Sequence, residues 1–251
     1  MSSTSPLFVA NWKMNKLNAD AVAFAHEASA FAKEELGERR VVLCPSFTSL
    51  HELAGMTQGT PIGIGAQDCS EHIEGPYTGQ VSASMVAQAG CSHCIVGHSE
   101  RRHGLGESTE LVAQKTQRVL EAGLIPIVCI GESQEEYNAK QTNIVLEQQL
   151  APIIEFMRHD DRLGTQALVI AYEPVWSIGT GIVADEEILR KTFDWLHSHV
   201  SSNSLCASCL LYGGSVSDQN ASSLLALAHV HGLLIGGASL DFQTFRKIVL
   251  S

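Results

Sequence analysis

Short runs of β-branched and aliphatic residues recur along the chain, and amphipathic stretches lie between them. Gly, Pro or polar residues bound each run, which is typical of buried strands. The expected strands are Leu7–Ala10, Val41–Cys44, Ile62–Ala66, Cys94–Gly97, Ile125–Ile130, Leu168–Tyr172, Leu210–Tyr212 and Leu233–Ile235. Eight runs in 251 residues give about 31 residues per unit, the size of a repeated strand and helix.

The intervals between these runs carry helical periodicity. The first, Asn18 to Leu36, is rich in Ala and has apolar residues at helical spacing. Side chains that commonly cap helices precede three further segments. They are Ser108 before Glu110–Ala122, Asp185 before Glu186–Val200 and Asp218 before Gln219–Ala228.

Strands that are apolar along their whole length, alternating with helices, predict a parallel sheet that is covered on both faces. Polar or Gly-rich residues follow six of the strands: Asn11 and Lys13, Gly97–Ser99, Gly131 and Glu132, Glu173 and Pro174, Gly213–Ser215, and Gly236 with Gly237. A closed barrel carries its chemistry at all its strand ends, whereas an open doubly wound sheet concentrates it at one switch point. We therefore predict an α/β protein, a single-domain eight-stranded parallel βα barrel over residues 1–251, with a flexible N-terminus at residues 1–6.

One segment also fits a dinucleotide-binding fingerprint. Residues Gly179–Ala184 read G-x-G-x-x-A, but that fingerprint must follow its strand directly. Here Glu173–Ile178 separates the two, so the match does not predict a dehydrogenase.

Composition narrows the possible partners and the compartment. Hydrophobic residues make up 45% of the chain and charged residues 17%, which suffices for a large core. The net charge of -11 repels polyanions, so we expect neither nucleic-acid nor membrane binding. The first apolar run, Leu7–Ala10, is too short for a signal peptide, and no run approaches the length of a membrane helix. These features favour a cytoplasmic location.

The seven cysteines are interpreted as thiols rather than disulfides, because most lie within apolar runs. Two C-x-x-C pairs, Cys91 with Cys94 and Cys206 with Cys209, leave a zinc site as an alternative. Each pair straddles the start of a strand, and more than a hundred residues separate the pairs, so we expect no metal site.

Glu173 is the first candidate for catalysis. It follows an apolar strand and precedes Pro174–Gly181, a stiff segment with Trp176 at one end and glycines at the other. Such a segment can close as a flap. Burial under it would raise the pKa of the Glu173 carboxyl toward that of a useful base, although an isolated Glu is more often a solvated loop residue.

Two more strand ends carry candidate chemistry. His98 lies beside an expected helical turn, whose N-terminal amides disfavour the imidazolium, so a neutral imidazole could polarise a carbonyl. Lys13 adds a cation beside Asn11. Because the overall charge opposes anions, a phosphate would need local amide donors, for which Gly179, Ser215 and the pair Gly236 and Gly237 are candidates.

Together these segments resemble the motifs of the triosephosphate isomerase family, in that family's order and from Asn11 to the last helix. The segments are Ala10–Asn15, Val96–Arg102, Cys129–Glu132, Ala171–Trp176, Ile178–Gly181, Tyr212–Val216 and Ile235–Leu240. The resemblance implies an eight-stranded βα barrel and a homodimer without metal or organic cofactor. It also implies the interconversion of dihydroxyacetone phosphate and glyceraldehyde 3-phosphate, a glycolytic and gluconeogenic reaction.

The resemblance also assigns roles, which are among the best-known examples of acid/base tuning. Glu173 is the base, and neutral His98 stabilises the enediolate. Lys13 and Asn11 hold the substrate, and the amides of Gly179, Ser215, Gly236 and Gly237 hold its phosphate. Glu100 and Cys129 support the site, and Thr78, in the loop Gly75–Gln80, reaches the partner subunit's site.

Several residues depart from the family pattern. Gln80 replaces a Glu that usually pairs with the arginine matching Arg101, and Asp68 stands where Asn is common. Ser177 and Ile182 are also unusual in the flap. His197 and His231 occupy positions that usually hold an Arg and its partner Asp, so we expect these two imidazoles to lie near each other.

Three other functions compete with isomerisation. An aldolase needs a Schiff-base lysine, and Lys13 is the only lysine expected near the mouth. A metal-dependent epimerase needs His and Asp ligands on several strands, which the sequence does not show. A non-catalytic phosphate-binding barrel is expected to lack Glu173 or His98, and both are present.

Overall fold

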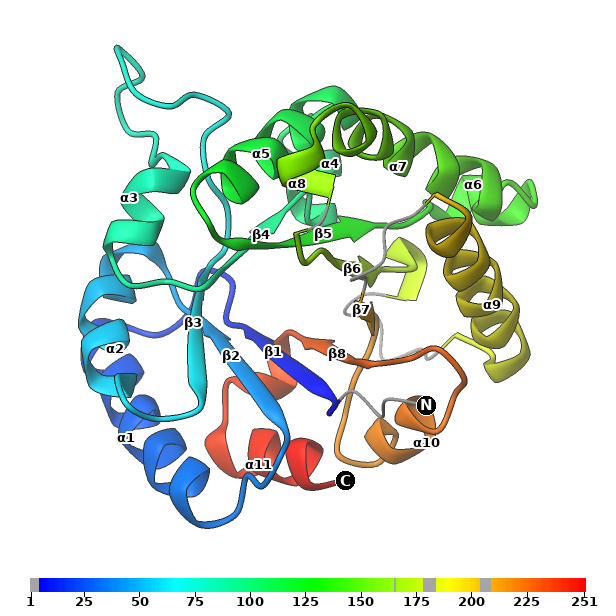
Figure 1. Ribbon diagram of the computed structural model, residues 1–251. Helices are drawn as coiled ribbons and strands as arrows, with labels where there is room; N and C mark the ends of the chain where they lie inside the picture. The colour runs from blue at the N-terminus through cyan, green and yellow to red at the C-terminus, as the bar shows by residue number, and fades with distance from the viewer. Residues whose placement is uncertain (1–4, 165, 178–183, 204–208) are drawn as a thin grey trace.

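Eight parallel strands close into a barrel in chain order, and helices surround it (Figure 1). The computed structural model describes residues 5–164, 166–177, 184–203 and 209–251. The strands are β1 (Leu7–Asn11), β2 (Arg40–Cys44), β3 (Ile62–Ala66), β4 (His93–Val96), β5 (Ile125–Ile130), β6 (Val169–Tyr172), β7 (Cys209–Tyr212) and β8 (Gly232–Ile235). The predicted fold class is confirmed, and the strand boundaries differ from the expected ones by one residue at most.

The barrel closes where β8 pairs with β1, with Leu7 opposite Gly232. Gly232 has a φ of +156°, and a Cβ there would lie 1.9 Å from the carbonyl oxygen of Leu7. Only glycine allows so close a backbone approach.

Strand side chains alternate between two apolar layers. Val9, Ile127 and Leu234 belong to the core inside the barrel. Phe8 and Leu43 point outward and pack with residues of the surrounding helices. Both faces of each strand are therefore buried, which explains why the strands read as continuous apolar runs.

The helices that cover the barrel are α1 (Asn18–Glu34), α2 (Leu50–Thr57), α3 (Ala83–Gln88), α4 (Ser99–Gly104), α5 (Thr109–Glu121), α6 (Gln134–Asn138), α7 (Thr142–His159), α8 (Asp161–Gly164), α9 (Glu186–Ser202), α10 (Ala221–Leu225) and α11 (Phe242–Leu250). Three 3₁₀ turns, η1 (Phe47–Ser49), η2 (Val175–Ser177) and η3 (Gly237–Ser239), follow strand ends. Within the described ranges, no helix combines the length and apolar composition needed to cross a bilayer.

Two of the three predicted helix caps are confirmed. The Ser108 side chain accepts a hydrogen bond from Leu111 N at 3.2 Å, and Asp185 accepts one from Glu187 N at 2.8 Å. The prediction for Asp218 was wrong, because Asn220 directs this turn: its Oδ1 accepts from Ser217 N at 2.8 Å, and α10 begins after it.

Some predicted features lie outside the described residues: residues 1–4 of the N-terminus, residues 178–183 of the flap with Gly179, Gly181 and Ile182, and Cys206 of the second C-x-x-C pair. Arg40 donates to the carbonyl oxygens of Ser5 and Pro6. The six cysteines in the described part of the chain are all free thiols.

Candidate active site

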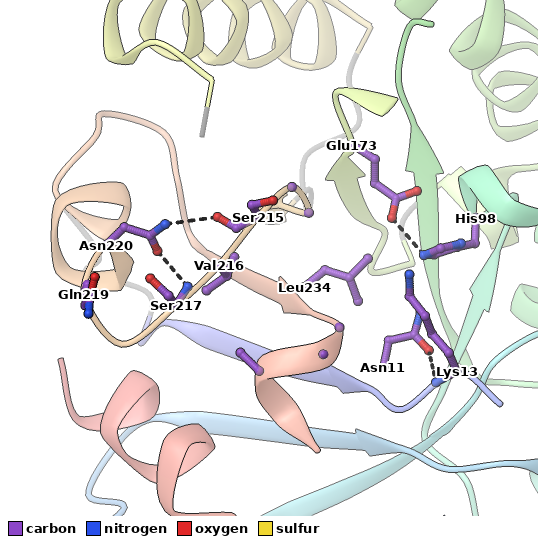
Figure 2. A pocket seen from close by; sticks show the side chains of 15 residues that line it. Asn11, Lys13, His98, Glu173, Ser215, Val216, Ser217, Gln219, Asn220 and Leu234 are labelled. Carbon is purple, nitrogen blue, oxygen red and sulfur yellow. Dashed lines mark hydrogen bonds and ion pairs between the residues drawn. The ribbon is translucent and has the colours of Figure 1, made fainter. Parts of the chain in front are cut away.

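A cavity of about 480 Å³ opens at the carboxyl ends of the strands (Figure 2). The residues predicted from separate strand ends line it together: Asn11, Lys13, His98, Glu173, Ser215, Gly236 and Gly237. The carboxyl ends of all strands in a parallel barrel meet at one face, so residues far apart in sequence share this cavity.

Lys13 has an unusual backbone conformation that directs its side chain. Its φ of +53° lies in the left-handed region, which disfavours residues with a Cβ. Asn11 Oδ1 accepts from Lys13 N at 3.0 Å, and Gln67 Nε2 donates to Lys13 O at 2.8 Å and to Cys44 O at 2.9 Å. Gln67 was not predicted as a site residue, although it directly follows the expected strand Ile62–Ala66.

The Lys13 ammonium contacts Glu100, with 2.7 Å between Nζ and Oε1. Glu100 lies in the first turn of α4, and its backbone N–H donates to His98 Nδ1 at 3.2 Å. Glu100 therefore touches both predicted functional side chains.

His98 and Glu173 contact each other on one side of the cavity, with 3.0 Å between Nε2 and Oε1 (Figure 2). His98 is 5% exposed and Glu173 is 2% exposed. Glu173 Oε2 accepts a second hydrogen bond from Ser99 N at 3.1 Å. Both carboxylate oxygens are thus occupied by groups of the β4–α4 segment.

The hydrogen bonds of His98 assign its tautomer. Because Nδ1 accepts from the Glu100 amide, the ring proton lies on Nε2, which donates to Glu173. A neutral imidazole at His98 is what the sequence predicted, but the nitrogen that carries the proton was not predicted.

The pKa shifts of Glu173 and His98 are opposite to the expected ones. Burial raises the pKa of Glu173, but the charge and hydrogen bond of His98 and the Ser99 amide outweigh burial, so the pKa is lowered. Burial lowers the pKa of His98, but the charge and hydrogen bond of Glu173 outweigh it, so the pKa is raised. The sequence predicted the opposite directions because it did not reveal that the two side chains contact each other.

The far side of the cavity is formed by the turns after β7 and β8. Ser215 Oγ donates to Ser177 O at 2.6 Å, and Asn220 Nδ2 donates to Ser215 O at 3.0 Å. A Cβ at Gly237 would meet nothing within 4 Å, so this backbone is open. A Cβ at Gly213 would lie 2.8 Å from Glu173 Cγ, so that glycine leaves room for the carboxylate.

Cys129 and Thr78 occupy different environments. Cys129 is fully buried in β5, and burial followed by the negative charge of Glu173 raises the pKa of its thiol. Thr78 is exposed on the segment between β3 and α3, which projects from the barrel (Figure 1).

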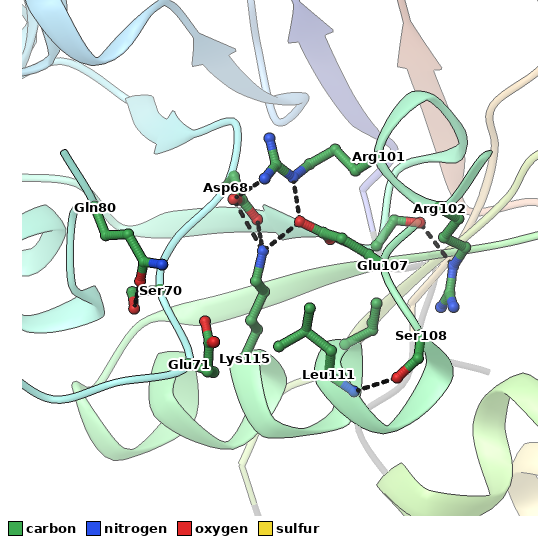
Figure 3. A network of polar contacts seen from close by, with 12 residues as sticks. Asp68, Ser70, Glu71, Gln80, Arg101, Arg102, Glu107, Ser108, Leu111 and Lys115 are labelled. Carbon is green, nitrogen blue, oxygen red and sulfur yellow. Dashed lines mark hydrogen bonds and ion pairs between the residues drawn. The ribbon is translucent and has the colours of Figure 1, made fainter. Parts of the chain in front are cut away.

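A four-residue charge network lies beside the cavity (Figure 3). Lys115 Nζ is 2.9 Å from Asp68 Oδ1 and 2.6 Å from Glu107 Oε1. Arg101 contacts the same carboxylates, at 2.9 Å from Asp68 and 2.7 Å from Glu107. Asp68 thus pairs with Arg101 within the chain, whereas Gln80 accepts a hydrogen bond from the Ser70 hydroxyl.

The expectation that His197 and His231 lie near each other agrees with the effect of His197 on the pKa of His231, but the direct stacking partner of His197 is a third imidazole. His197 stacks on His229, with ring centroids 3.9 Å apart and an interplanar angle of 17°. His231 Nδ1 instead accepts from Leu210 N at 3.0 Å. Burial lowers the pKa of His231, and the charges of His229 and His197 lower it further. The stacking partner, His229, follows α10 with a φ of +65° and was not predicted from the sequence.

Comparison with known proteins agrees with this geometry. The family model described as triosephosphate isomerase matches residues 6–251. This chain belongs to the triosephosphate isomerase family. Its enzymatic activity is the interconversion of dihydroxyacetone phosphate and glyceraldehyde 3-phosphate, and its substrates are triose phosphates.

Individual relatives match over nearly their whole length. The triosephosphate isomerase of Aquifex aeolicus is 40% identical over 249 residues, covering 98% of each chain. That of Bordetella pertussis is 42% identical over 248 residues, covering 96% of this chain and 95% of the relative. The crystal structure of the Bartonella henselae enzyme superimposes with a TM-score of 0.82 at 34% identity, covering 97% of each chain. These matches support neither another sugar-phosphate enzyme nor a non-catalytic barrel.

Proposed function

We propose that the cavity formed by Asn11, Lys13, His98 and Glu173 catalyses this isomerisation by proton transfer through an enediolate. The observation that carries the proposal is the 3.0 Å contact between a buried imidazole and a buried carboxylate in a cavity that also holds an ammonium group. A proton shuttle needs a base and a hydrogen-bond donor on the same small substrate.

Glu173 is proposed as the base that moves the proton between the two substrate carbons. In the structure His98 and Ser99 lower the pKa of Glu173 against the effect of burial. A substrate that separates Glu173 from these donors leaves the burial effect, which raises the pKa. Substrate binding thus converts a weak base into a stronger one.

His98 and Lys13 are proposed to stabilise the negative charge that develops on the substrate. The Nε2 proton of His98, released from Glu173, donates to the carbonyl oxygen. Lys13, with Asn11 beside it, supplies positive charge to the enediolate and the phosphate. Glu100 and Cys129 support the site, because Glu100 contacts Lys13 and His98 and Cys129 lies behind Glu173.

The phosphate is proposed to bind the backbone amides of Ser215, Gly236 and Gly237. A fourth proposed donor, the amide of Gly179, lies outside the described residues. In a chain of net charge -11, local amide donors are needed to hold a dianion. The open backbone at Gly237 favours this arrangement. No metal or organic cofactor is needed for the proposed proton transfer.

The active form is proposed to be a cytoplasmic homodimer in which the loop Gly75–Gln80 carries Thr78 to the partner's site. The projection of this loop and the exposed side chains of Tyr77 (38%) and Leu105 (68%) favour an interface there. Deleting the loop tip should give monomers of low activity in sedimentation and turnover measurements. A wild-type chain that is monomeric and fully active would exclude the proposal.

The decisive experiment replaces Glu173 with Gln, which keeps the shape of the side chain and removes the base. We expect Glu173→Gln to abolish turnover and the exchange of the C1 proton of dihydroxyacetone phosphate with deuterated solvent. Glu187→Gln is the matched control, because among the described residues the Glu187 side chain forms an ion pair with exposed Lys191 on α9, far from the cavity residues in sequence. Proton exchange that survives in Glu173→Gln would assign the base elsewhere, and borohydride trapping at Lys13 would indicate an aldolase instead.

A further inference from the structure

Arg102 lies directly behind the His98 and Glu173 pair, but no step of the proposed mechanism uses it. Its guanidinium donates from Nε to Gly97 O at 2.9 Å and to Cys129 O at 3.3 Å. Nη2 also donates to Cys129 O at 3.2 Å, and Nη1 donates to the Thr109 hydroxyl at 3.4 Å. Within the described ranges it makes no ion pair, in contrast to neighbouring Arg101, which joins the network of Figure 3.

One carbonyl that Arg102 binds directly precedes His98, and the other lies on β5, the strand that pairs with β6 next to Glu173. Gly97 immediately precedes His98 at the end of β4. Cys129 is the residue before Ile130, whose carbonyl accepts from Glu173 N at 2.7 Å. One planar side chain therefore connects the backbone of the acid to the backbone that holds the base.

The absence of a side chain at Gly97 leaves room for the Arg102 guanidinium. Its φ is +67°, and a Cβ there would lie 2.9 Å from Arg102 Nη2 and 2.6 Å from Val112 Cγ1. Arg102 and Glu173 also line the same small gap, together with Ser99 and Gly131. Burial lowers the pKa of Arg102, and the negative charge of Glu173 acts in the opposite direction, so the cation and the base interact.

We propose that Arg102 is a positioning residue for the isomerisation: its guanidinium joins the Gly97 and Cys129 carbonyls and so fixes His98 relative to Glu173. The inference rests on the roles proposed above for these two residues. A guanidinium presents several donors in one plane, which suits two carbonyls in a fixed geometry, whereas an ammonium offers a single point of charge.

The test compares Arg102→Met and Arg102→Lys with the control Arg246→Met. Arg246 pairs with Glu35 and packs over Phe31, on the α1 and α11 side of the barrel. In Arg102→Met we expect kcat to fall by about tenfold to a hundredfold with a smaller change in KM, because a displacement near 1 Å has such a cost. The acid limb of kcat/KM should also move to higher pH, because loss of a nearby cation raises the pKa of Glu173.

Arg102→Lys separates the effect of the positive charge from the effect of the planar hydrogen-bonding geometry. It keeps the charge, so the acid limb should stay at the wild-type pH while kcat remains reduced. All variants are compared well below their melting temperatures, so a lower stability does not mimic the effect. If Arg102→Met does not fold, Arg102→Lys decides the question: a wild-type kcat overturns the inference, and a reduced kcat supports it.

A folded Arg102→Met with the kcat and pH profile of Arg246→Met would also overturn the inference. Failure of the inference differs from failure of the proposed function. If the wild type isomerises triose phosphates and Glu173→Gln does not, a normal Arg102→Met removes only the role of Arg102. If the wild type does not isomerise them, the proposed function itself fails.

Discussion

His93, at the end of the barrel opposite the active site, should make the stability of the folded protein sensitive to acid. The imidazole lies at the start of β4, where its Nδ1 is 2.8 Å from Ser92 Oγ. It packs on β3 where Gly65 has no side chain, since a Cβ there would lie 3.3 Å from His93 Cβ. Burial, and then the charge of Arg40, lowers the pKa of His93 from 6.5 to about 4.

The sign and size of the effect follow from proton linkage. Below pH 6.5 the unfolded chain binds a proton on His93 that the folded chain does not bind until about pH 4. The stability is therefore full above pH 6.5 and falls as the pH decreases to 4. At about 1.36 kcal/mol per pH unit, His93 should account for a loss of roughly 3 kcal/mol between pH 7 and pH 4.

The assay is urea unfolding of wild type and His93→Gln from pH 7 to pH 4 at one protein concentration. The substitution itself changes the stability by an amount that does not depend on pH. The free energy of unfolding of the wild type minus that of His93→Gln should therefore decrease by about 3 kcal/mol from pH 7 to pH 4. His26→Gln, which removes an exposed imidazole on α1, is the control. A change in the difference of less than about 1 kcal/mol would refute the reasoning, because it would mean that folded His93 accepts its proton near the ordinary pH.

Three further substitutions test the site and its neighbourhood. Glu173→Asp withdraws the carboxylate by roughly 1 Å and should lower kcat about a hundredfold in a coupled isomerase assay, and near-normal turnover would contradict its role as base. Lys13→Met should abolish turnover and leave the circular dichroism spectrum unchanged, and surviving activity would indicate another cation. Lys115→Met strands the carboxylates of Asp68 and Glu107 with one cation and should cost about 3 to 5 kcal/mol, or roughly 10 °C in Tm. A Tm as high as that of the wild type would show that the network is not stabilising.

The barrel could be predicted from sequence because its strands are buried on both faces. Continuous apolar runs such as Ile125–Ile130 allow few alternatives, and their polar C-terminal ends converge by topology alone. Ser108 and Asp185 were predictable because a cap acts within one turn of the chain. The cap prediction for Asp218 was wrong for the same local reason, because the Asn220 side chain forms a competing turn two residues later.

Side-chain partners across the barrel could not be predicted in this way. The Asp68, Arg101, Glu107 and Lys115 network joins residues that lie up to 47 positions apart, and its geometry depends on long side chains with many rotamers. Asp68 was noticed only as a departure from the family pattern. In the structure, Asp68 supplies a carboxylate to Arg101 from within the chain. Gln80, which replaces the usual Glu, is neutral and binds the Ser70 hydroxyl instead.

The contact between His98 and Glu173 explains how the site can hold the proposed base and the proposed acid without destabilising the fold. A carboxylate that is 2% exposed and without partners would be costly to keep charged. Pairing with the Nε2 proton and the Ser99 amide removes that cost when no substrate is present. The same pairing blocks both groups, because the base is hydrogen-bonded and the donor is occupied. In the proposed mechanism, a substrate carbonyl that accepts from His98 replaces the hydrogen bond between His98 and Glu173, so both groups become reactive only when the triose phosphate is bound.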